Sequence, residues 1–199
     1  MLEYKKDFRY AFDSISNMLD YPNSLLKNSA KTYKEYFQTH YEINDKNFLK
    51  YLDFIETTPI EKLEEIYTGF FDLNPFNCLY MGYHIFGESY YRSKLLVDLK
   101  TTYKSQSFEI NKELPDHLVV ILKFLVANSD INLGLEILSD IIKPGIEKLL
   151  ENLNTENNDE LPVISSYSFH KKMYSSVLIV LLNFLKDKTF TELMLSQEE

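Results

Sequence analysis

The most informative stretch of the chain for its fold is Glu113-Leu114-Pro115-Asp116-His117-Leu118-Val119-Val120-Ile121-Leu122-Lys123-Phe124-Leu125, which passes from polar into apolar sequence. Its apolar residues recur at helical spacing, so we predict a strongly apolar helix from Asp116 to about Ala127. Pro115 suits the first turn of a helix, and the Asp116 carboxylate would complement the positive end of the helix dipole. His117 has no such explanation, because a histidine cation opposes that dipole. Beside Asp116 it can donate or accept a hydrogen bond and change charge near neutral pH.

The same periodicity continues upstream, with a cap or stop between successive helices. We predict helices from Phe8 to Leu19, Ser24 to about Thr39, Asp45 through Ile55, Pro59 through Phe70, Leu79 to Phe86 and Ser89 through Tyr103. Ser24, Asp45 and Ser89 are the predicted N-caps, and Gly87 is the predicted stop. Residues 71–77 contain Asn74-Pro75, and because a residue before proline disfavours the helix, we predict a compact loop there.

Downstream, a helix is predicted from about Ile131 to Leu153, with a kink or split at Pro144-Gly145 because proline removes a helical hydrogen bond. A flexible acidic loop is expected over about 154–166, then a last helix from Ser168 to Lys186 and a short tail over about 187–199. The apolar core of that helix, residues 177–180, could also form a strand. The expected fold is a single all-α domain over residues 1–199, a bundle of about nine or ten helices.

Composition limits the classes of function. Hydrophobic residues make up 45% of the 199 residues and charged residues 26%, with only 5 glycines and 6 prolines, which favours a helical globular protein over an all-β one. The net charge of −9 and the absence of a basic cluster argue against nucleic-acid binding and suit a basic partner such as an arginine-bearing peptide. The 14 phenylalanines and 15 tyrosines suit a protein-binding surface.

The expected location is the cytoplasm. The N-terminus has no apolar stretch typical of a secretory signal, and the longest apolar run, residues 177–182, is far shorter than the roughly 20 residues that span a bilayer, so membrane insertion is not expected. The single cysteine, Cys78, excludes an intramolecular disulfide, which suits a reducing compartment.

Catalytic signatures are mostly missing. The chain has no nucleophile elbow, phosphate-binding loop or dinucleotide fingerprint, and its four histidines are not spaced as metal ligands, so we expect no catalytic residue, no metal and no cofactor of its own. Three alternatives remain open from the residues alone. One is a hydrolase or nucleotide-binding protein that uses Asp116 and His117, another is a nucleophilic pair of Cys78 and a histidine, and the third is a helical adaptor for unrelated proteins.

Several segments, taken in order, resemble one family. They are Met18-Leu19-Asp20-Tyr21-Pro22 and, within the stretch from Tyr67 to Leu125, Phe71-Asp72-Leu73, Leu79-Tyr80-Met81-Gly82-Tyr83-His84, Phe86-Gly87-Glu88-Ser89, Arg92, Glu113-Leu114-Pro115-Asp116-His117-Leu118 and Leu122-Lys123-Phe124-Leu125. Together they resemble the TorD-type redox-enzyme maturation chaperones, and most closely the nitrate reductase delta-subunit (NarJ-type) branch. The chain differs from the usual pattern at Glu88, where the family typically has aspartate, and at Ser93, where it tends to have glycine.

The resemblance implies an all-α chaperone, not an enzyme. It implies binding to the N-terminal segment of a molybdopterin-containing catalytic subunit, foremost respiratory nitrate reductase, and help with cofactor insertion and complex assembly. The client-binding candidates that it implies are Phe71, Asp72, Tyr80, His84, Gly87, Arg92, Pro115, Asp116 and His117. The protein is expected to be a monomer or a dimer that exchanges its last helix.

Overall fold

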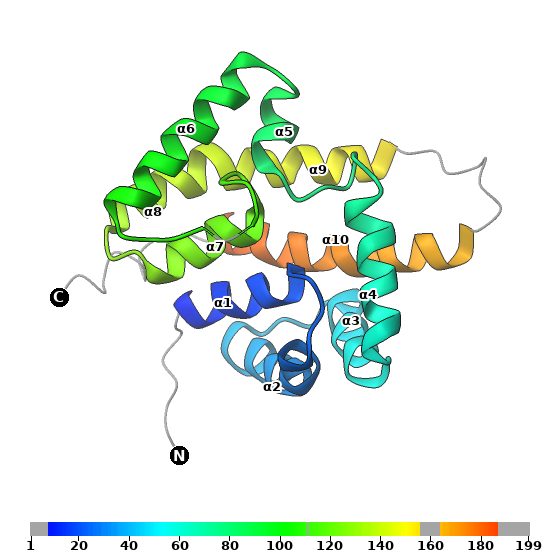
Figure 1. Ribbon diagram of the computed structural model, residues 1–199. Coiled ribbons are helices and arrows are strands. Elements are labelled where there is room, and N and C mark those ends of the chain that lie inside the picture. Colours follow the sequence, from blue (N-terminus) through cyan, green and yellow to red (C-terminus); the bar gives the residue numbers. More distant parts are fainter. Residues whose placement is uncertain (1–7, 111, 156–163, 187–199) are drawn as a thin grey trace.

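The computed structural model describes residues 8–110, 112–155 and 164–186, and every regular element among them is helical (Figure 1). The α-helices are α1 (Phe8–Leu19), α2 (Ser24–Tyr41), α3 (Lys46–Thr57), α4 (Ile60–Tyr67), α5 (Met81–Phe86), α6 (Tyr90–Ser105), α7 (Leu118–Ala127), α8 (Ile131–Ile137), α9 (Lys143–Thr155) and α10 (Ile164–Lys186). Two π-helical turns, η1 (Thr68–Asp72) and η2 (Leu138–Ile142), extend α4 and join α8 to α9. The prediction of an all-α bundle of nine or ten helices is confirmed.

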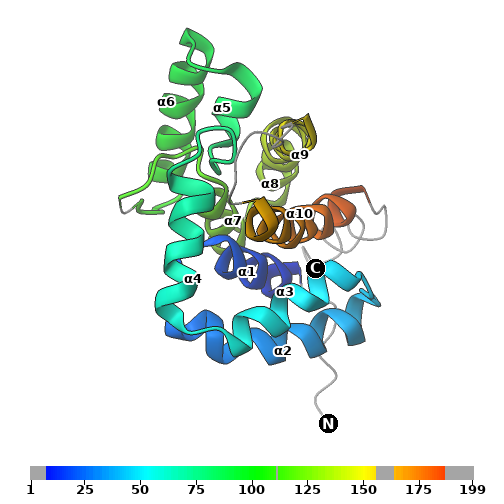
Figure 2. The same ribbon diagram turned by 90° about the vertical axis from the view of Figure 1, so that its right-hand side faces the viewer.

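Helix α10 forms the centre of the bundle. It contacts α1, α3, α9 and η1, and Figures 1 and 2 show it passing between α9 on one side and α1 and α3 on the other. Residues 177–180 lie within α10, so they are helical rather than a strand, and Val177, Leu178 and Leu181 are fully buried. Among the described helices, none has the length and apolarity that crossing a membrane would require.

The helix caps follow the sequence with small corrections. Asp45 caps α3 by accepting hydrogen bonds from two backbone N–H groups, and Ser89 caps α6, both as predicted. The prediction of Ser24 as a cap is wrong by one residue, because Asn23 has the extended backbone and its side chain accepts from Leu26 N. Gly87 ends α5 with a φ of 61° and a ψ of −160°, a combination that glycine adopts without strain and other residues rarely do.

Both π-helical turns fall where the sequence suggested irregular backbone. The prediction of a loop over residues 71–77 is partly wrong, because η1 continues the helix through Asp72 and the loop begins at Leu73. At the kink or split predicted for Pro144, the structure has η2, which separates α8 from α9 and immediately precedes Lys143. A widened turn accommodates a residue that lacks an N–H and would crowd the carbonyl one turn earlier.

The predicted acidic loop over 154–166 is too long at both ends. Helix α9 continues to Thr155 and α10 begins at Ile164, so five of those positions are helical. The early start of α10 fits the packing of Tyr167, whose ring lies 5.5 Å from the Phe70 ring. Residues 156–163 and the predicted tail, 187–199, lie outside the described residues.

Candidate functional site

Two short segments that are distant in sequence meet in front of α5 and α7. The Leu118 N–H donates to the Leu79 carbonyl at 2.8 Å, and the Met81 N–H donates to the Asp116 carbonyl at 2.9 Å. These bonds form an isolated antiparallel bridge between Tyr80 and His117, whose rings lie edge to face with centroids 5.1 Å apart. The bridge fixes two predicted site residues side by side.

The interpretation of Asp116 as a helix-start acid is wrong. Helix α7 begins at Leu118, and the Asp116 carboxylate is fully buried and accepts a hydrogen bond from Arg92 Nε at 3.0 Å. His117 occupies the cap position without a capping hydrogen bond, and it is only 8% exposed. The tertiary pairing with Arg92, which sequence spacing cannot show, is the interaction that holds the Asp116 carboxylate.

Arg92 is held on several sides. Its Nη1 donates to Glu88 at 2.7 Å, and its guanidinium carbon lies 5.6 Å from the ring centroids of both Tyr80 and Tyr83. Burial opposes its charge, but the hydrogen bond and attraction from Asp116, together with Glu88, raise the pKa of Arg92. The Arg92 guanidinium is therefore held in a fixed position.

Two further close contacts hold the Arg92–Asp116 pair and the segment before α7 in place. A Cβ at Gly82 would lie 2.7 Å from Asp116 Oδ2, so only glycine lets α5 approach the Arg92–Asp116 pair this closely. Behind it, the Tyr103 hydroxyl donates to the Pro115 carbonyl at 2.9 Å, which fixes the segment leading into α7.

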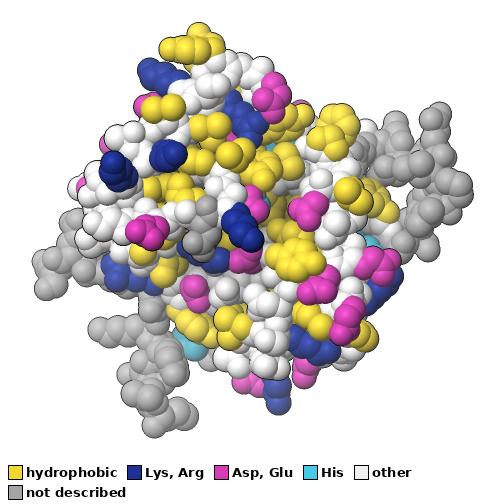
Figure 3. Space-filling model, in the orientation of Figure 1, with side chains coloured by type: hydrophobic (Ala, Val, Ile, Leu, Met, Phe, Trp, Pro, Cys, Tyr) yellow, Lys and Arg dark blue, Asp and Glu magenta, His cyan; other side chains and the backbone are white. Residues whose placement is uncertain are grey.

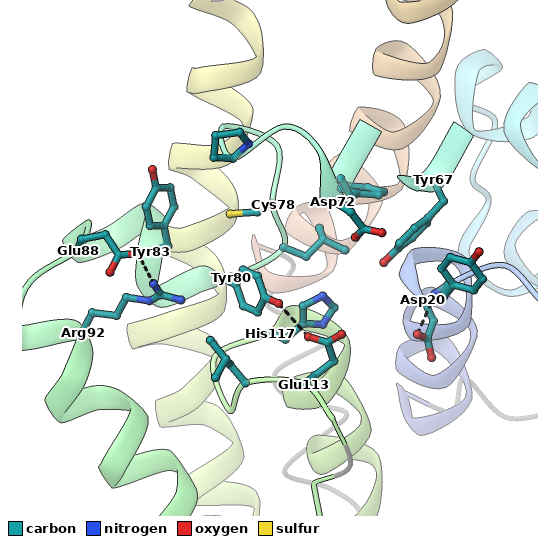
Figure 4. A pocket seen from close by; sticks show the side chains of 15 residues that line it. Asp20, Tyr67, Asp72, Cys78, Tyr80, Tyr83, Glu88, Arg92, Glu113 and His117 are labelled. Atoms are coloured by element: carbon teal, nitrogen blue, oxygen red, sulfur yellow. Dashed lines mark hydrogen bonds and ion pairs between the residues drawn. The ribbon is translucent and has the colours of Figure 1, made fainter. Parts of the chain in front are cut away.

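These elements enclose one side of an open cavity of about 540 Å³ (Figure 4). Most of its lining side chains are aromatic or carboxylate-bearing: Asp20, Tyr21, Tyr67, Phe71, Asp72, Pro75, Cys78, Leu79, Tyr80, Tyr83, Glu88, Arg92, Glu113, Leu114 and His117. Figure 3 shows hydrophobic and acidic side chains intermixed in the middle of one face of the molecule. A cavity of this size can take side chains of a peptide.

The predicted site residues divide into two groups. Phe71, Asp72, Tyr80, Arg92 and His117 line the cavity, which brings together residues from four separate parts of the chain. The other four, His84, Gly87, Pro115 and Asp116, do not line it. His84 contacts the Cys78 carbonyl, Asp116 holds the Arg92 side chain, Gly87 ends α5 and the Pro115 carbonyl accepts from Tyr103. Direct contact of these four with a client stays a prediction.

Sequence reasoning did not select several lining residues as binding candidates. Asp20, Tyr21 and Glu113 lie in segments that carried the family resemblance, so a signal for them was present. Tyr67 lies outside the individual motifs, at the start of the stretch that contains them. Its hydroxyl donates to the Leu19 carbonyl at 3.0 Å, and this bond places its ring beside the end of α1.

The cavity is electrostatically negative. Asp20, Asp72, Glu88 and Glu113 contribute carboxylates, against the cation of Arg92. Burial lowers the pKa of His117, which favours its neutral form despite the carboxylates around it. Burial and the nearby Glu113 raise the pKa of Asp72, as expected where negative charges gather. A cationic guest would relieve this repulsion.

A second cavity of about 530 Å³ shares Asp20, Glu113 and His117 with the first. The rest of its lining combines apolar side chains with two lysines and a glutamate: Phe108, Glu109, Ile110, Lys112, Val119, Val120 and Lys123. Lys123 pairs with Asp20 across its wall. The two cavities therefore form adjoining parts of one surface, acidic and aromatic in one part and more apolar in the other.

The catalytic alternatives find no support in this geometry. The Asp116 carboxylate is engaged by Arg92 and does not line the cavity, so it cannot act there with His117. The Cys78 sulfur lies 3.9 Å from His84 Nε2, but that nitrogen lies 2.6 Å from the Cys78 carbonyl oxygen. Burial raises the pKa of Cys78 and lowers that of His84, which disfavours a thiolate–imidazolium pair. Within the described residues, no three metal-binding side chains gather to form an ion site.

The comparison with protein families identifies the group to which this architecture belongs. The model of the family described as nitrate reductase delta subunit matches residues 40–155, which is more than half of the chain. The chain belongs to this family. A solved structure from Archaeoglobus fulgidus, assigned as a redox enzyme maturation protein, is similar over 94% of this chain and 99% of its own, with a TM-score of 0.59 and 18% sequence identity. At that identity the likeness shows the fold alone. No curated protein matches the chain.

Membership of the delta-subunit family confirms the resemblance found in the sequence. Its members are redox-enzyme maturation chaperones, so the prediction that this protein is not an enzyme is also confirmed. The matched residues include all nine predicted site residues. They exclude α1, Asp20 directly after it, and α10, which forms the centre of the bundle.

Proposed function

We propose that this delta-subunit protein binds the N-terminal segment of a molybdopterin-containing catalytic subunit, with respiratory nitrate reductase as the favoured client. It would assist cofactor insertion and complex assembly before that subunit leaves the cytoplasm. The observation that carries the proposal is the cavity of about 540 Å³, with its carboxylates and tyrosines and its apolar neighbour.

A peptide in an amphipathic conformation matches these two cavities. Apolar side chains would enter the part lined by Phe108, Ile110 and Val119, while basic side chains would face Asp72 and Glu113. Recognition of a helix or extended segment in such a groove relies on a few anchors and on charge complementarity. A chaperone has to release its client, so modest affinity suffices.

Within this proposal the predicted residues take two roles. Phe71, Asp72, Tyr80 and His117 contact the client, and Arg92 forms the wall beside it. Asp116 acts by holding Arg92 in place, as its buried hydrogen bond suggests. His84 acts by fixing the backbone of Cys78 in front of α5.

Calorimetric titration tests the proposal. The probe is a synthetic peptide covering the N-terminus of the proposed client, the catalytic subunit of respiratory nitrate reductase. The wild-type protein should bind it, and the double variant Asp72→Asn/Glu113→Gln should bind about tenfold or more weakly because two charge-assisted contacts are lost. Asp98→Asn removes an exposed carboxylate on α6 that lines neither cavity, and it should bind like the wild type. No binding, or equal weakening by the control, refutes the proposed site.

A cellular experiment separates this function from that of a general adaptor. Deletion of the gene should abolish the activity of the molybdoenzyme while its polypeptide is still made, because the cofactor is not inserted. An adaptor for unrelated proteins would leave that activity intact. Restoring activity with wild-type protein but not with the double variant links the cavity to maturation.

A further inference from the structure

Helix α6 lies at the edge of the molecule and turns most of its surface to solvent. Figures 1 and 2 show it beside α5, which is the helix that it contacts most. Its buried side chains, Arg92, Leu99 and Tyr103, lie on the inner side of the helix. Since 3.6 residues complete a turn, the residues on the opposite side form one exposed stripe along the whole helix, the outer stripe: Tyr90, Lys94, Val97, Thr101 and Lys104.

Aromatic rings cover the corner where α5 ends and α6 begins. Tyr90 and Tyr91 are 78% and 68% exposed, and Phe86 at the end of α5 is also exposed. The centroid of the Tyr91 ring lies 6.3 Å from that of Phe86 and 6.2 Å from that of Tyr90, so the three rings form one patch. Val97 continues it along the outer stripe and is 64% exposed. None of these four residues lines either cavity, so the client site does not account for their exposure.

The same face of α6 is basic, although the chain as a whole has a net charge of −9. Lys94, Lys100 and Lys104 are exposed on it, and the one acidic residue of the helix is Asp98. Among the described residues, none of the three lysines forms an ion pair. Lys104 lies in the last turn, where a cation complements the helix dipole, but this explanation does not extend to the other two. Figure 3 shows basic and hydrophobic side chains together over α6, in the upper left of the molecule.

We propose that the outer stripe of α6, with Tyr91, Phe86 and Lys100 beside it, is a docking surface for an anionic phospholipid bilayer. Lysines are attracted to anionic headgroups, and their aliphatic stems allow the ammonium groups to reach them. Tyrosine combines an apolar ring with a polar tip, and such side chains settle at the boundary between headgroups and acyl chains. The helix would lie along the membrane surface with its tyrosine end in the headgroup layer.

The shape of this face favours a membrane over a protein partner. Of the α6 side chains, only Arg92 lines either cavity, and it does so from the inner side of the helix. Protein interfaces concentrate their binding energy in side chains that fill pockets. A convex helix with tyrosines and lysines along its length can instead lie against a flat charged surface. Salt screens charges beyond about 8 to 10 Å, so the carboxylates elsewhere on the chain do not prevent docking through α6.

Co-sedimentation of the full-length protein with lipid vesicles tests the proposal. Vesicles of phosphatidylcholine mixed with phosphatidylglycerol should bind the wild-type protein, vesicles of phosphatidylcholine alone should not, and added NaCl should release the bound protein. The variant Lys94→Gln/Lys100→Gln/Lys104→Gln should bind the anionic vesicles about tenfold or more weakly, since each lysine near such a surface contributes about fivefold.

A matched control removes the same charge elsewhere. Lys31→Gln/Lys46→Gln/Lys50→Gln changes three exposed lysines on α2 and α3, which Figure 1 shows at the other end of the molecule, and it should bind like the wild type. All six lysines are exposed, so both variants should fold, and their circular dichroism spectra verify this.

An introduced tryptophan reports which part of the protein meets the lipid. The chain contains no tryptophan, so Tyr90→Trp places a single fluorophore at the exposed start of α6. Its emission should shift to shorter wavelength with anionic vesicles, and brominated acyl chains should quench it. Leu25→Trp, at an exposed position on α2, is the control and should show neither effect.

Each outcome decides the inference. No binding to anionic vesicles, equal weakening by the control triple variant, or a Tyr90→Trp signal that brominated lipid leaves unchanged overturns it. Binding to polyglutamate without binding to vesicles would show that α6 recognises an acidic polypeptide, and the membrane surface would be wrong. The proposed function is tested separately. The three α6 lysines line neither cavity, so their variant should bind the client peptide like the wild type, and loss of that binding would assign α6 to the client site instead.

Discussion

Replacing Gly82 by alanine should destabilise the protein by inserting one methyl group between α5 and the Arg92–Asp116 pair. The added Cβ would lie 2.7 Å from Asp116 Oδ2, 2.9 Å from a Leu95 methyl and 3.4 Å from Arg92 Cγ. The leucine methyl can rotate away. The carboxylate cannot withdraw easily, because its position is fixed by the 3.0 Å hydrogen bond to Arg92.

Two effects of opposite sign set the magnitude. Alanine gains about 0.5 to 1 kcal/mol over glycine in a helix, because the unfolded chain loses less freedom on folding. Overpacking of a close contact costs about 1 to 3 kcal/mol. The expected net loss is therefore up to about 2.5 kcal/mol, which corresponds to a decrease of up to about 10 °C in Tm for a chain of this size.

Urea denaturation followed by circular dichroism measures this loss. Gly69→Ala is the matched control, since Gly69 lies on the exposed side of a helical turn and a Cβ there would meet nothing within 4 Å. This control should be neutral or slightly stabilised. If Gly82→Ala is as stable as Gly69→Ala, the close approach of α5 to the Arg92–Asp116 pair does not exist as described.

Three further outcomes can be measured. Asp116→Asn should lower the free energy of unfolding in urea by about 2 to 3 kcal/mol, because it leaves a nearly buried arginine with one partner, while Asp98→Asn should change it by less than about 0.5 kcal/mol. Tyr67→Phe should cost about 1 kcal/mol by the same assay, since a carbonyl at the end of α1 loses its donor, whereas Tyr90→Phe, at a side chain 78% exposed, should be neutral. Burial lowers the pKa of His117, so near pH 6 the unfolded chain binds more protons than the folded one, and stability should fall as the pH drops through the window below 6.5. The fall should be smaller in His117→Gln, and an unchanged slope would contradict the burial of this side chain.

The helices could be predicted because their determinants are local. The apolar spacing of residues 118–125, the caps Asp45 and Ser89 and the stop at Gly87 each act within one or two turns, and all of them are present in the structure. The errors are local as well. They concern Asn23, one residue from the predicted cap, and Phe71-Asp72, where a π-helical turn extends the helix. The others are the start of α7 at Leu118 and the ends of α9 and α10, which shorten the predicted loop.

The site could be predicted only in part. The family resemblance pointed to Phe71, Asp72, Tyr80, Arg92 and His117, which do share one cavity. It also named residues that lie behind the cavity, because a motif does not distinguish a side chain that contacts a ligand from one that positions it. That distinction depends on burial and on partners from other helices.

The segment at Glu113–Leu118 shows the division most clearly. The sequence alone determined that an apolar helix follows it, that the chain is all-helical, and that the ordered motifs indicate a maturation chaperone. Only the tertiary structure decided that Asp116 turns inward to Arg92 while Glu113 faces the cavity. The physical reason is that helix formation depends on neighbouring residues, whereas the direction and charge environment of a loop side chain are set by partners 24 or more residues away.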